Sequence, residues 1–432
     1  MAENTALHSA RDAKNDEFYT QYSDIEAEMN AYVEFNPDVF RDKTILLPCD
    51  DPEWSNFTKY FAANFERFGL KKLISTSYAK SAGSQQLTLF EQESPLFDAD
   101  KHDTHGKLFT LTRDKDGSGH VDTDDIEFSG YLDGDGDFRS REVKALRDEA
   151  DIIITNPPFS LFREFLAWIL EAGKQFVILG NMNAITYKEV FPHLKDNEIW
   201  LGYKSLNQDM YFDVPEERRQ WLLENKKEGS AYKIINGVVM GRLASACWFT
   251  NLDHNKRHEP LMLDTMEHNL KFNKRLRKKF ERDYGVNEYP HYDNYDAIEV
   301  PFVEAIPSDY DGVMGVPITF LDKYNPEQFE IVAFRKGEDG KDLVFTRERE
   351  REFNRTFVSL FDVNSGDDKE CGRKDKWEDY LRQNHGQTKK EPVDAIFPLS
   401  TNLSNGLIND CRVNGKKTYV RMLIQSKKGV NV

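Results

Sequence analysis

The segment DIIITNPPFS, residues 151–160, contains the residues of this chain whose types and order are best suited to chemistry. Its apolar run predicts a buried strand, which ends at Asn156, Pro157, Pro158 and Phe159. Proline fixes its own φ angle and lacks a backbone donor, so the strand must end in a rigid turn. The side-chain oxygen of Asn156 and the backbone carbonyl of Pro157 could then each accept a hydrogen bond from one amino group.

Such a pair of acceptors suits the exocyclic amino group of adenine, whose lone pair is delocalised into the ring. Two hydrogen bonds would push this nitrogen toward tetrahedral geometry and direct its lone pair at an incoming methyl group. Phe159 could stack on the base, which must first leave the duplex because its reactive atom is unreachable inside it. The alternative is a proline pair that only ends a strand. The full tetrapeptide directly after a strand favours the functional interpretation.

The elements that must position this turn are predicted by apolar runs separated by helical segments. The main runs are residues 43–49, 151–156 and 174–181, and residues 56–76 predict a helix followed by a second strand. Residues 187–198 predict a helix interrupted near Pro192, and residues 199–205 and 245–252 predict further strands. This alternation predicts an α/β fold with a Rossmann-like doubly wound sheet, in which ligands bind at the carboxyl ends of the strands.

The chain of 432 residues is long enough for two domains. We expect a catalytic domain over residues 1–255 with a hairpin insertion at about 79–130. A mixed α+β domain is expected over residues 256–432, with a charged insertion at about 340–410. No apolar run reaches the roughly 20 residues of a membrane helix, and the polar N-terminus lacks a secretory signal, so a cytoplasmic protein is expected. The four cysteines lie far apart, which argues against disulfides and zinc.

The net charge of −17 counts against a nucleic-acid partner unless the binding surface is locally basic. Residues 271–282 form such a basic segment, although a solvated helix face is the alternative interpretation. The segment 414–428 is a weaker candidate. The basic residues singled out for DNA are Lys271, Lys274, Arg275, Arg277, Lys278 and Lys279.

Asn-Pro-Pro-Phe after a strand is the signature of S-adenosylmethionine-dependent amino-methyltransferases, and the whole chain resembles the EcoRI-type adenine-specific DNA modification methylases. This resemblance implies methyl transfer from S-adenosylmethionine to the N6 amino group of a flipped adenine in double-stranded DNA, without a metal. It further implies that residues 256–432 recognise the target and that a cognate restriction endonuclease could exist. The matching stretches are residues 16–26, 49–74, 134–140, 151–162, 185–191, 199–202, 292–298, 309–330 and 413–424.

The resemblance also implies a cofactor site in three segments. Tyr19 and Thr20 would pack against the methionine end, the turn at Asp50, Asp51 and Pro52 would hold the methionine moiety, and Asp137 and Phe138 would bind the adenine ring. The turn departs from the wider superfamily because residues 46–57 contain no glycine. Residues 73–78 offer no carboxylate for the cofactor ribose.

The segment DKDGSGHVDTDD, residues 114–125, matches a calcium-loop template by spacing. Its flanks alternate like strands, whereas the calcium hand needs helices, so a hairpin tip without metal is expected.

Three alternative functions remain at this point. Methylation of cytosine is less favoured because such enzymes usually begin the motif with serine. Methylation of protein glutamine is less favoured because those enzymes keep a Gly-rich cofactor turn. A catalytically inactive DNA-binding or regulatory protein on the same fold is the third.

Overall fold

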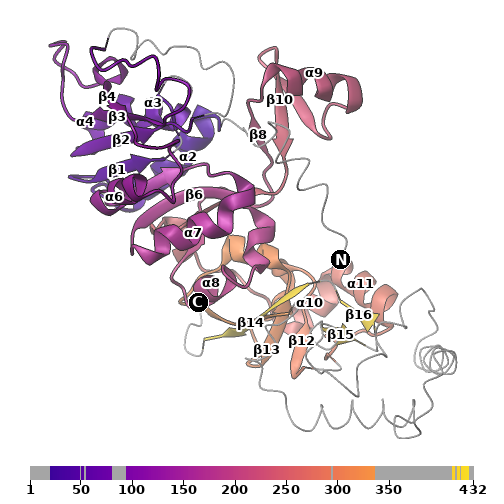
Figure 1. The fold of residues 1–432 in the computed structure, drawn as a ribbon. Coiled ribbons are helices and arrows are strands. Elements are labelled where there is room, and N and C mark those ends of the chain that lie inside the picture. Colours follow the sequence, from indigo (N-terminus) through magenta and orange to yellow (C-terminus); the bar gives the residue numbers. More distant parts are fainter. Residues whose placement is uncertain are drawn as a thin grey trace, which may run out of the picture. The chain divides into compact units, whose positions relative to one another are not determined.

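The computed structural model describes residues 20–48, 50–52, 55–79, 94–292, 295–335, 411–413, 416–418 and 420–427 (Figure 1). The chain divides into two compact units. Unit 1 comprises residues 1–184 and 198–255, and unit 2 comprises residues 185–197 and 256–432. Tyr19 and the charged insertion expected at 340–410 lie outside the described residues.

Unit 1 is built on an eight-stranded sheet with the order β4-β3-β2-β1-β5-β6-β11-β7. Strands β2, β1, β5 and β6 are parallel, whereas β3, β4 and β11 each run antiparallel to a neighbour. The predicted α/β class is therefore confirmed as a large mixed sheet with helices. The strands are β1 (Thr44–Leu47), β2 (Lys72–Thr76), β3 (Lys107–Leu111), β4 (Glu127–Tyr131), β5 (Ile152–Thr155), β6 (Gln175–Asn181), β7 (Trp200–Leu201) and β11 (Ala246–Thr250).

The helices of unit 1 follow the capping signals in the sequence. Ser55 accepts hydrogen bonds from the backbone N–H groups of Phe57 and Thr58 and so starts α3, while Gly69, with φ of 63°, ends α4. Helices α3, α6 and α7 pack against β2, β1 and β6, respectively. The helices are α2 (Tyr22–Phe35), α3 (Asn56–Ala63), α4 (Phe65–Phe68), α6 (Arg141–Glu149), α7 (Phe162–Glu171) and the short η1 (Thr123–Asp125), η2 (Phe159–Leu161) and η3 (Met182–Thr186).

The strand order reverses between β1 and β5. From β1 the chain continues to β2 on one side, and after β3 and β4 it returns through α6 to β5 on the other side of β1. Every residue of β1 and β5 is buried, as expected for parallel strands covered on both faces. Open α/β sheets bind ligands outside the carboxyl ends of the strands at such a reversal.

A segment between β7 and β11 forms a small sheet of its own. Its strands have the order β8-β10-β9, and all neighbours are antiparallel. Asn236 and Gly237, with φ angles of 50° and 81°, make the tight turn between β9 and β10. The elements are β8 (Met210–Phe212), α9 (Glu216–Asn225), β9 (Tyr232–Ile235) and β10 (Val238–Leu243).

Unit 2 contains a four-stranded sheet with the order β12-β13-β17-β14 and the helices α10 and α11, of which α11 is rich in basic residues. Helix α8 begins at Phe191, so Pro192 lies in its first turn and does not interrupt a longer helix as predicted. The other elements are η4 (Asn255–His258), α10 (Met266–Phe272), α11 (Lys274–Tyr284), β12 (Ala297–Glu299), η5 (Val303–Ala305), β13 (Val313–Val316), η6 (Ile318–Lys323), β14 (Phe329–Arg335), β15 (Arg412–Val413), β16 (Lys416–Lys417) and β17 (Arg421–Ser426), while α8 ends at Lys195.

Candidate active site

The Asn-Pro-Pro-Phe turn lies at the carboxyl end of β5, where the strand order reverses. Asn156, Pro158 and Phe159 are half-buried, and Pro157 is buried. Phe159 begins the 3-10 turn η2 and packs against the edge of the main core. The backbone N–H of Leu161 donates to the carbonyl of Pro158 over 2.9 Å. The turn therefore has a fixed backbone, with an amide and an aromatic ring at the edge of the sheet.

A buried carboxyl joins this turn to the neighbouring strand β1. The hydroxyl of Thr155, directly before Asn156, lies 2.6 Å from Oδ2 of Asp50 and 2.9 Å from the carbonyl oxygen of Pro48. The hydroxyl of Ser55 donates to Oδ1 of Asp50 over 2.7 Å. The end of β1, the end of β5 and the start of α3 are thus tied together by one side chain.

Burial raises the pKa of Asp50 to about 7, because a charge is poorly solvated inside the protein. The hydroxyl of Thr155 has one proton for two acceptors, Asp50 and Pro48. A neutral Asp50 can satisfy this geometry by donating its own proton to Thr155, whose proton then goes to Pro48. Both carboxyl oxygens of Asp50 are engaged inside the protein, so its assignment to the cofactor stays a prediction. Asp51 is half-buried and Pro52 is buried in the same turn.

The backbone of this turn is fixed by side-chain hydroxyls. Thr58 donates to the backbone carbonyl of Asp50 over 3.0 Å, and the hydroxyl of Ser75 on β2 donates to the same oxygen. These contacts give a physical account of how a turn without glycine keeps one shape. Sequence reasoning missed Ser55, Thr58, Ser75 and Thr155. Their sequence signal was a hydroxyl side chain near the end of a predicted strand, as for Ser75 and Thr155. For Ser55 and Thr58 it was a pair of hydroxyl side chains near the start of a predicted helix.

Thr20 provides a test of whether the site fits the methionine end of the cofactor. Its backbone carbonyl accepts a hydrogen bond from the Asn56 side chain over 2.8 Å, which places Thr20 at the start of α3, beside the turn that follows β1. The Thr20 hydroxyl is buried and has no hydrogen-bond partner among the described residues. A buried polar atom without a partner is unfavourable unless a ligand satisfies it. The residues present here therefore fit a polar ligand.

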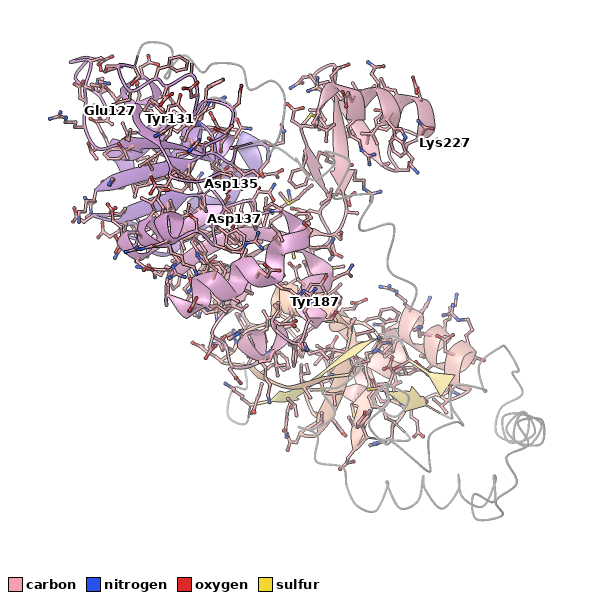
Figure 2. The ribbon with its side chains drawn as sticks, viewed as in Figure 1. Glu127, Tyr131, Asp135, Asp137, Tyr187 and Lys227 are labelled. Atoms are coloured by element: carbon pink, nitrogen blue, oxygen red, sulfur yellow. The ribbon has the colours of Figure 1, made fainter. Side chains whose placement is uncertain are left out.

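A glycine-rich loop, residues 133–138, lies against the carboxyl end of β2. The N–H of Ala79 donates to the carbonyl of Asp135 over 2.7 Å. A Cβ on Gly136 would lie 2.4 Å from the carbonyl oxygen of Ser77, so only glycine permits this approach. Asp135 and Asp137 both belong to this loop (Figure 2). The loop thus brings carboxylates to a strand end where the sequence of β2 offered none.

Asp137 and Phe138 are both held by neighbouring side chains. Asp137 accepts hydrogen bonds from Nε and Nη2 of Arg139 over 2.9 and 2.6 Å, and this guanidinium holds the pKa of the Asp137 carboxyl below its ordinary value. Phe138 is buried, with its ring edge-to-face against Phe165 and Trp168 of α7. Their predicted contacts with the cofactor adenine remain predictions.

In unit 2, the basic segment predicted for DNA contact forms the end of α10 and most of α11. Three of its cations are ion-paired, since Arg275 contacts Glu304 at 3.0 Å, and Lys279 and Arg282 contact Asp283 at 2.5 and 2.7 Å. The remaining cations form no ion pair with any residue that the structure describes. These are Lys271, Lys274, Arg277 and Lys278, all of them exposed.

The segment that resembles a calcium loop connects β3 and β4 and is flanked by strands. Carboxylate oxygens of Asp114, Asp116 and Asp125 lie within 4.8 Å of one another. Each carboxylate accepts backbone hydrogen bonds from the loop, as Asp114 does from Gly117 over 2.6 Å. These bonds explain why the three side chains converge, and the absence of a metal stays a prediction.

Comparisons with known proteins bear on the whole chain. The family profile described as "Adenine-specific methyltransferase EcoRI" matches residues 6–427. The chain is 44% identical over 342 residues to the Type II methyltransferase M.EcoRI of Escherichia coli, an alignment that covers 79% of this chain and 93% of that protein. It is 33% identical over 330 residues to the Type II methyltransferase M.MpnI of Mycoplasma pneumoniae, covering 76% of this chain and 84% of that protein.

A third relative is the Type II methyltransferase M.MgeORF184P of Mycoplasma genitalium, which is 36% identical over 326 residues. That alignment covers 76% of this chain and 85% of the relative. No solved structure matches. Among the described residues, no helix is both long enough and apolar enough to span a membrane.

Proposed function

The chain belongs to the EcoRI family of adenine-specific methyltransferases, and we propose that its Asn-Pro-Pro-Phe turn methylates the N6 amino group of an adenine extruded from duplex DNA. The protein is a DNA adenine methyltransferase of the restriction–modification type. The observation that supports the proposed site is the position of this turn, at the carboxyl end of β5 where the strand order reverses.

The side chains of the turn divide the chemistry between them. The side-chain oxygen of Asn156 and the carbonyl of Pro157 accept hydrogen bonds from the adenine amino group, which localises its lone pair. Pro158 keeps the backbone in one shape, and Phe159 stacks on the flipped base, a contact worth about 1 to 3 kcal/mol. Thr155, held by Asp50, fixes the end of the strand that carries Asn156. The reaction is a direct transfer with no covalent enzyme intermediate.

The methyl donor of this family is generally S-adenosylmethionine, which supplies the methyl group when bound. We assign its methionine end to Thr20 and the turn at Asp50, Asp51 and Pro52. The adenosine end is assigned to the loop with Asp137 and Phe138, where Asp135 is an additional candidate for the ribose. The buried Thr20 hydroxyl without a described partner supports the first assignment.

Unit 2 is assigned to target recognition, with the unpaired cations of α10 and α11 on DNA phosphates. This assignment rests on charge, since phosphate contacts supply most of the affinity of proteins for DNA. A cognate restriction endonuclease acting on the same site, and a cytoplasmic location, are parts of the same proposal. Methylation of cytosine or glutamine is not favoured, because the chain matches an adenine-specific family over residues 6–427.

The experiment is to substitute the two side chains of the turn and measure N6-methyladenine formed in unmethylated DNA. Asn156→Ala should lower the turnover rate by about 100-fold or more, as expected when a hydrogen bond made in the transition state is lost. Phe159→Ala should reduce the rate strongly, whereas Phe159→Tyr keeps a stacking ring and should retain most activity. Full activity of Asn156→Ala and Phe159→Ala would contradict the proposed site.

A further inference from the structure

Residues 203–245, which we call the arm, are inserted into unit 1 at the edge that carries the Asn-Pro-Pro-Phe turn. Strand β7 runs antiparallel to β11, which runs antiparallel to β6, so β7 points in the same direction as β5 and β6. The chain leaves the sheet at the carboxyl end of β7 and returns to it at Ala246. The arm therefore starts and ends at the edge where the substrate base is proposed to bind.

The base of the arm is firmly held. Met210 and Phe212 of β8 are fully buried in the main core of unit 1. The carboxylate of Glu28 on α2 accepts hydrogen bonds from the backbone N–H groups of Tyr203 and Lys204 over 2.7 and 3.0 Å. Farther out, α9 packs on the small sheet through a separate apolar cluster, whose buried members are Val214, Leu222 and Tyr232. The arm is thus a structured projection and not a loose loop.

The outer helix of the arm carries an exposed ring between two cations. Trp221 is 40% exposed, whereas tryptophan is highly buried on average. The guanidinium of Arg218 lies 4.3 Å from the ring centroid, and the ammonium of Lys226 lies 5.4 Å from it. Lys227 follows directly, just beyond the carboxyl end of α9 (Figure 2). This cluster presents positive charge beside an apolar surface.

The other charges of the arm are mostly engaged. Arg219 is paired with Asp213 at 2.5 Å, and Arg242 with Asp209 at 2.8 Å. Arg218 and Lys226 form no ion pair with any residue in the described part of the chain. By helical spacing, the acids Glu217 and Glu224 lie on the stripe of α9 next to Trp221, so the positive surface is bounded on one side. In a chain with a net charge of −17, a cluster of cations without ion pairs to the described residues is suited to an anionic partner.

We propose that the arm is a second DNA-contacting element, in which Arg218 and Lys226 bind phosphates of the substrate duplex and Trp221 packs on the sugars beside them. The inference rests on the proposed function, because it takes the substrate base to bind at this edge of the sheet. The arm provides DNA contacts from unit 1, and these contacts are independent of those assigned to the basic residues of α10 and α11 in unit 2. Each phosphate neutralised by a lysine or arginine releases counterions, so the contact has a measurable signature in salt.

The test compares Arg218→Gln/Lys226→Gln with wild type in the full-length protein. The probe is a fluorescent duplex carrying the site that the wild type methylates in expressing cells. Its dissociation constant is measured over a series of salt concentrations. Loss of two phosphate contacts should reduce the slope of log affinity against log salt by about 1.8. The control Lys43→Gln/Lys71→Gln removes two cations from the amino-end edge, directly before β1 and β2, and should leave the slope unchanged.

Trp221→Ala should weaken binding by several-fold at every salt concentration, with the slope unchanged, because an uncharged ring releases no counterions. Thermal unfolding of each variant checks that the arm stays folded. A wild-type slope in the double glutamine variant would overturn the inference, and so would a dimer in sedimentation that only the arm variants disrupt. If the wild type methylates no adenine, the proposed function fails instead, whatever the arm variants show.

Discussion

Thr20 is the residue whose environment in the structure points most directly to a ligand. Its hydroxyl is buried without a described partner, next to the turn assigned to the methionine end of the cofactor. Thr20→Val should weaken S-adenosylmethionine binding by about 3- to 10-fold, the value of one net hydrogen bond, without lowering stability. Calorimetric titration and thermal unfolding would measure the two effects.

Thr58→Val is the matched control for this prediction. The Thr58 hydroxyl donates to the backbone carbonyl of Asp50 over 3.0 Å, so its removal should lower stability. Unchanged cofactor affinity in Thr20→Val would contradict the assignment of Thr20 to the methionine end of S-adenosylmethionine.

Asp50 gives a prediction about pH. Its folded pKa is raised from 3.8 to about 7, so the folded protein favours the neutral carboxyl. The resulting stabilisation is complete below pH 3.8 and is lost as the pH rises to about 7. Asp50→Asn cannot ionise and can still donate to Thr155, so wild type should lose stability relative to this variant between about pH 4 and pH 7. Urea unfolding at several pH values would show this.

Asp50→Ala tests how much the hydrogen bonds of this side chain contribute to stability, apart from its charge. It leaves the hydroxyls of Ser55 and Thr155 without their buried partner and should cost about 1 to 3 kcal/mol. A stability difference between wild type and Asp50→Asn that is constant with pH would refute the neutral-carboxyl interpretation.

At the scale of elements, α2 links two parts of the site. Thr20 precedes this helix, and Glu28 within it binds the backbone at the base of the arm. A Cβ on Gly202 would lie 2.1 Å from Oε1 of Glu28 and 2.5 Å from Cβ of Trp248, both in buried surroundings. The residue before the arm must therefore be glycine for the helix and the arm to meet.

Gly202→Ala should lower the free energy of unfolding by about 1 to 3 kcal/mol, the usual cost of overpacking. Gly134→Ala is the comparison, because its added Cβ meets no atom within 4 Å and its φ is not positive. We expect its stability to stay within about 0.5 kcal/mol of wild type. Denaturant unfolding of both variants measures the difference, and equal stabilities would show that Gly202 tolerates a side chain.

At the scale of the whole molecule, an acidic protein must bind DNA through local basic surfaces. Lys274→Gln/Arg277→Gln/Lys278→Gln in α11 should weaken DNA binding and reduce the salt slope by about 2.7. Lys279→Gln should leave the slope nearly unchanged, because Lys279 is paired with Asp283. Anisotropy titrations over a salt series would test both. If Lys279→Gln reduced the salt slope as much per charge as the triple variant, ion pairing would not decide which cations contact DNA.

The sequence by itself determined the strand ended by Asn156, Pro157, Pro158 and Phe159 and the mixed α/β architecture around it. These features follow from hydrophobic period and proline geometry, which act between near neighbours in the chain. The sequence also sufficed to identify the methyltransferase family, because the family is recognised by the residues themselves and not by their positions in space.

Only the tertiary structure decided which distant residues meet. Asp50 contacts Thr155, which lies 105 positions away in the sequence, and this hydrogen bond links the end of β1 to the end of β5. The ion pairs of Arg275 and Lys279, and the arm at the carboxyl end of β7, were equally invisible to local patterns. Hydrogen bonds, ion pairs and burial depend on distances that the order of residues does not set.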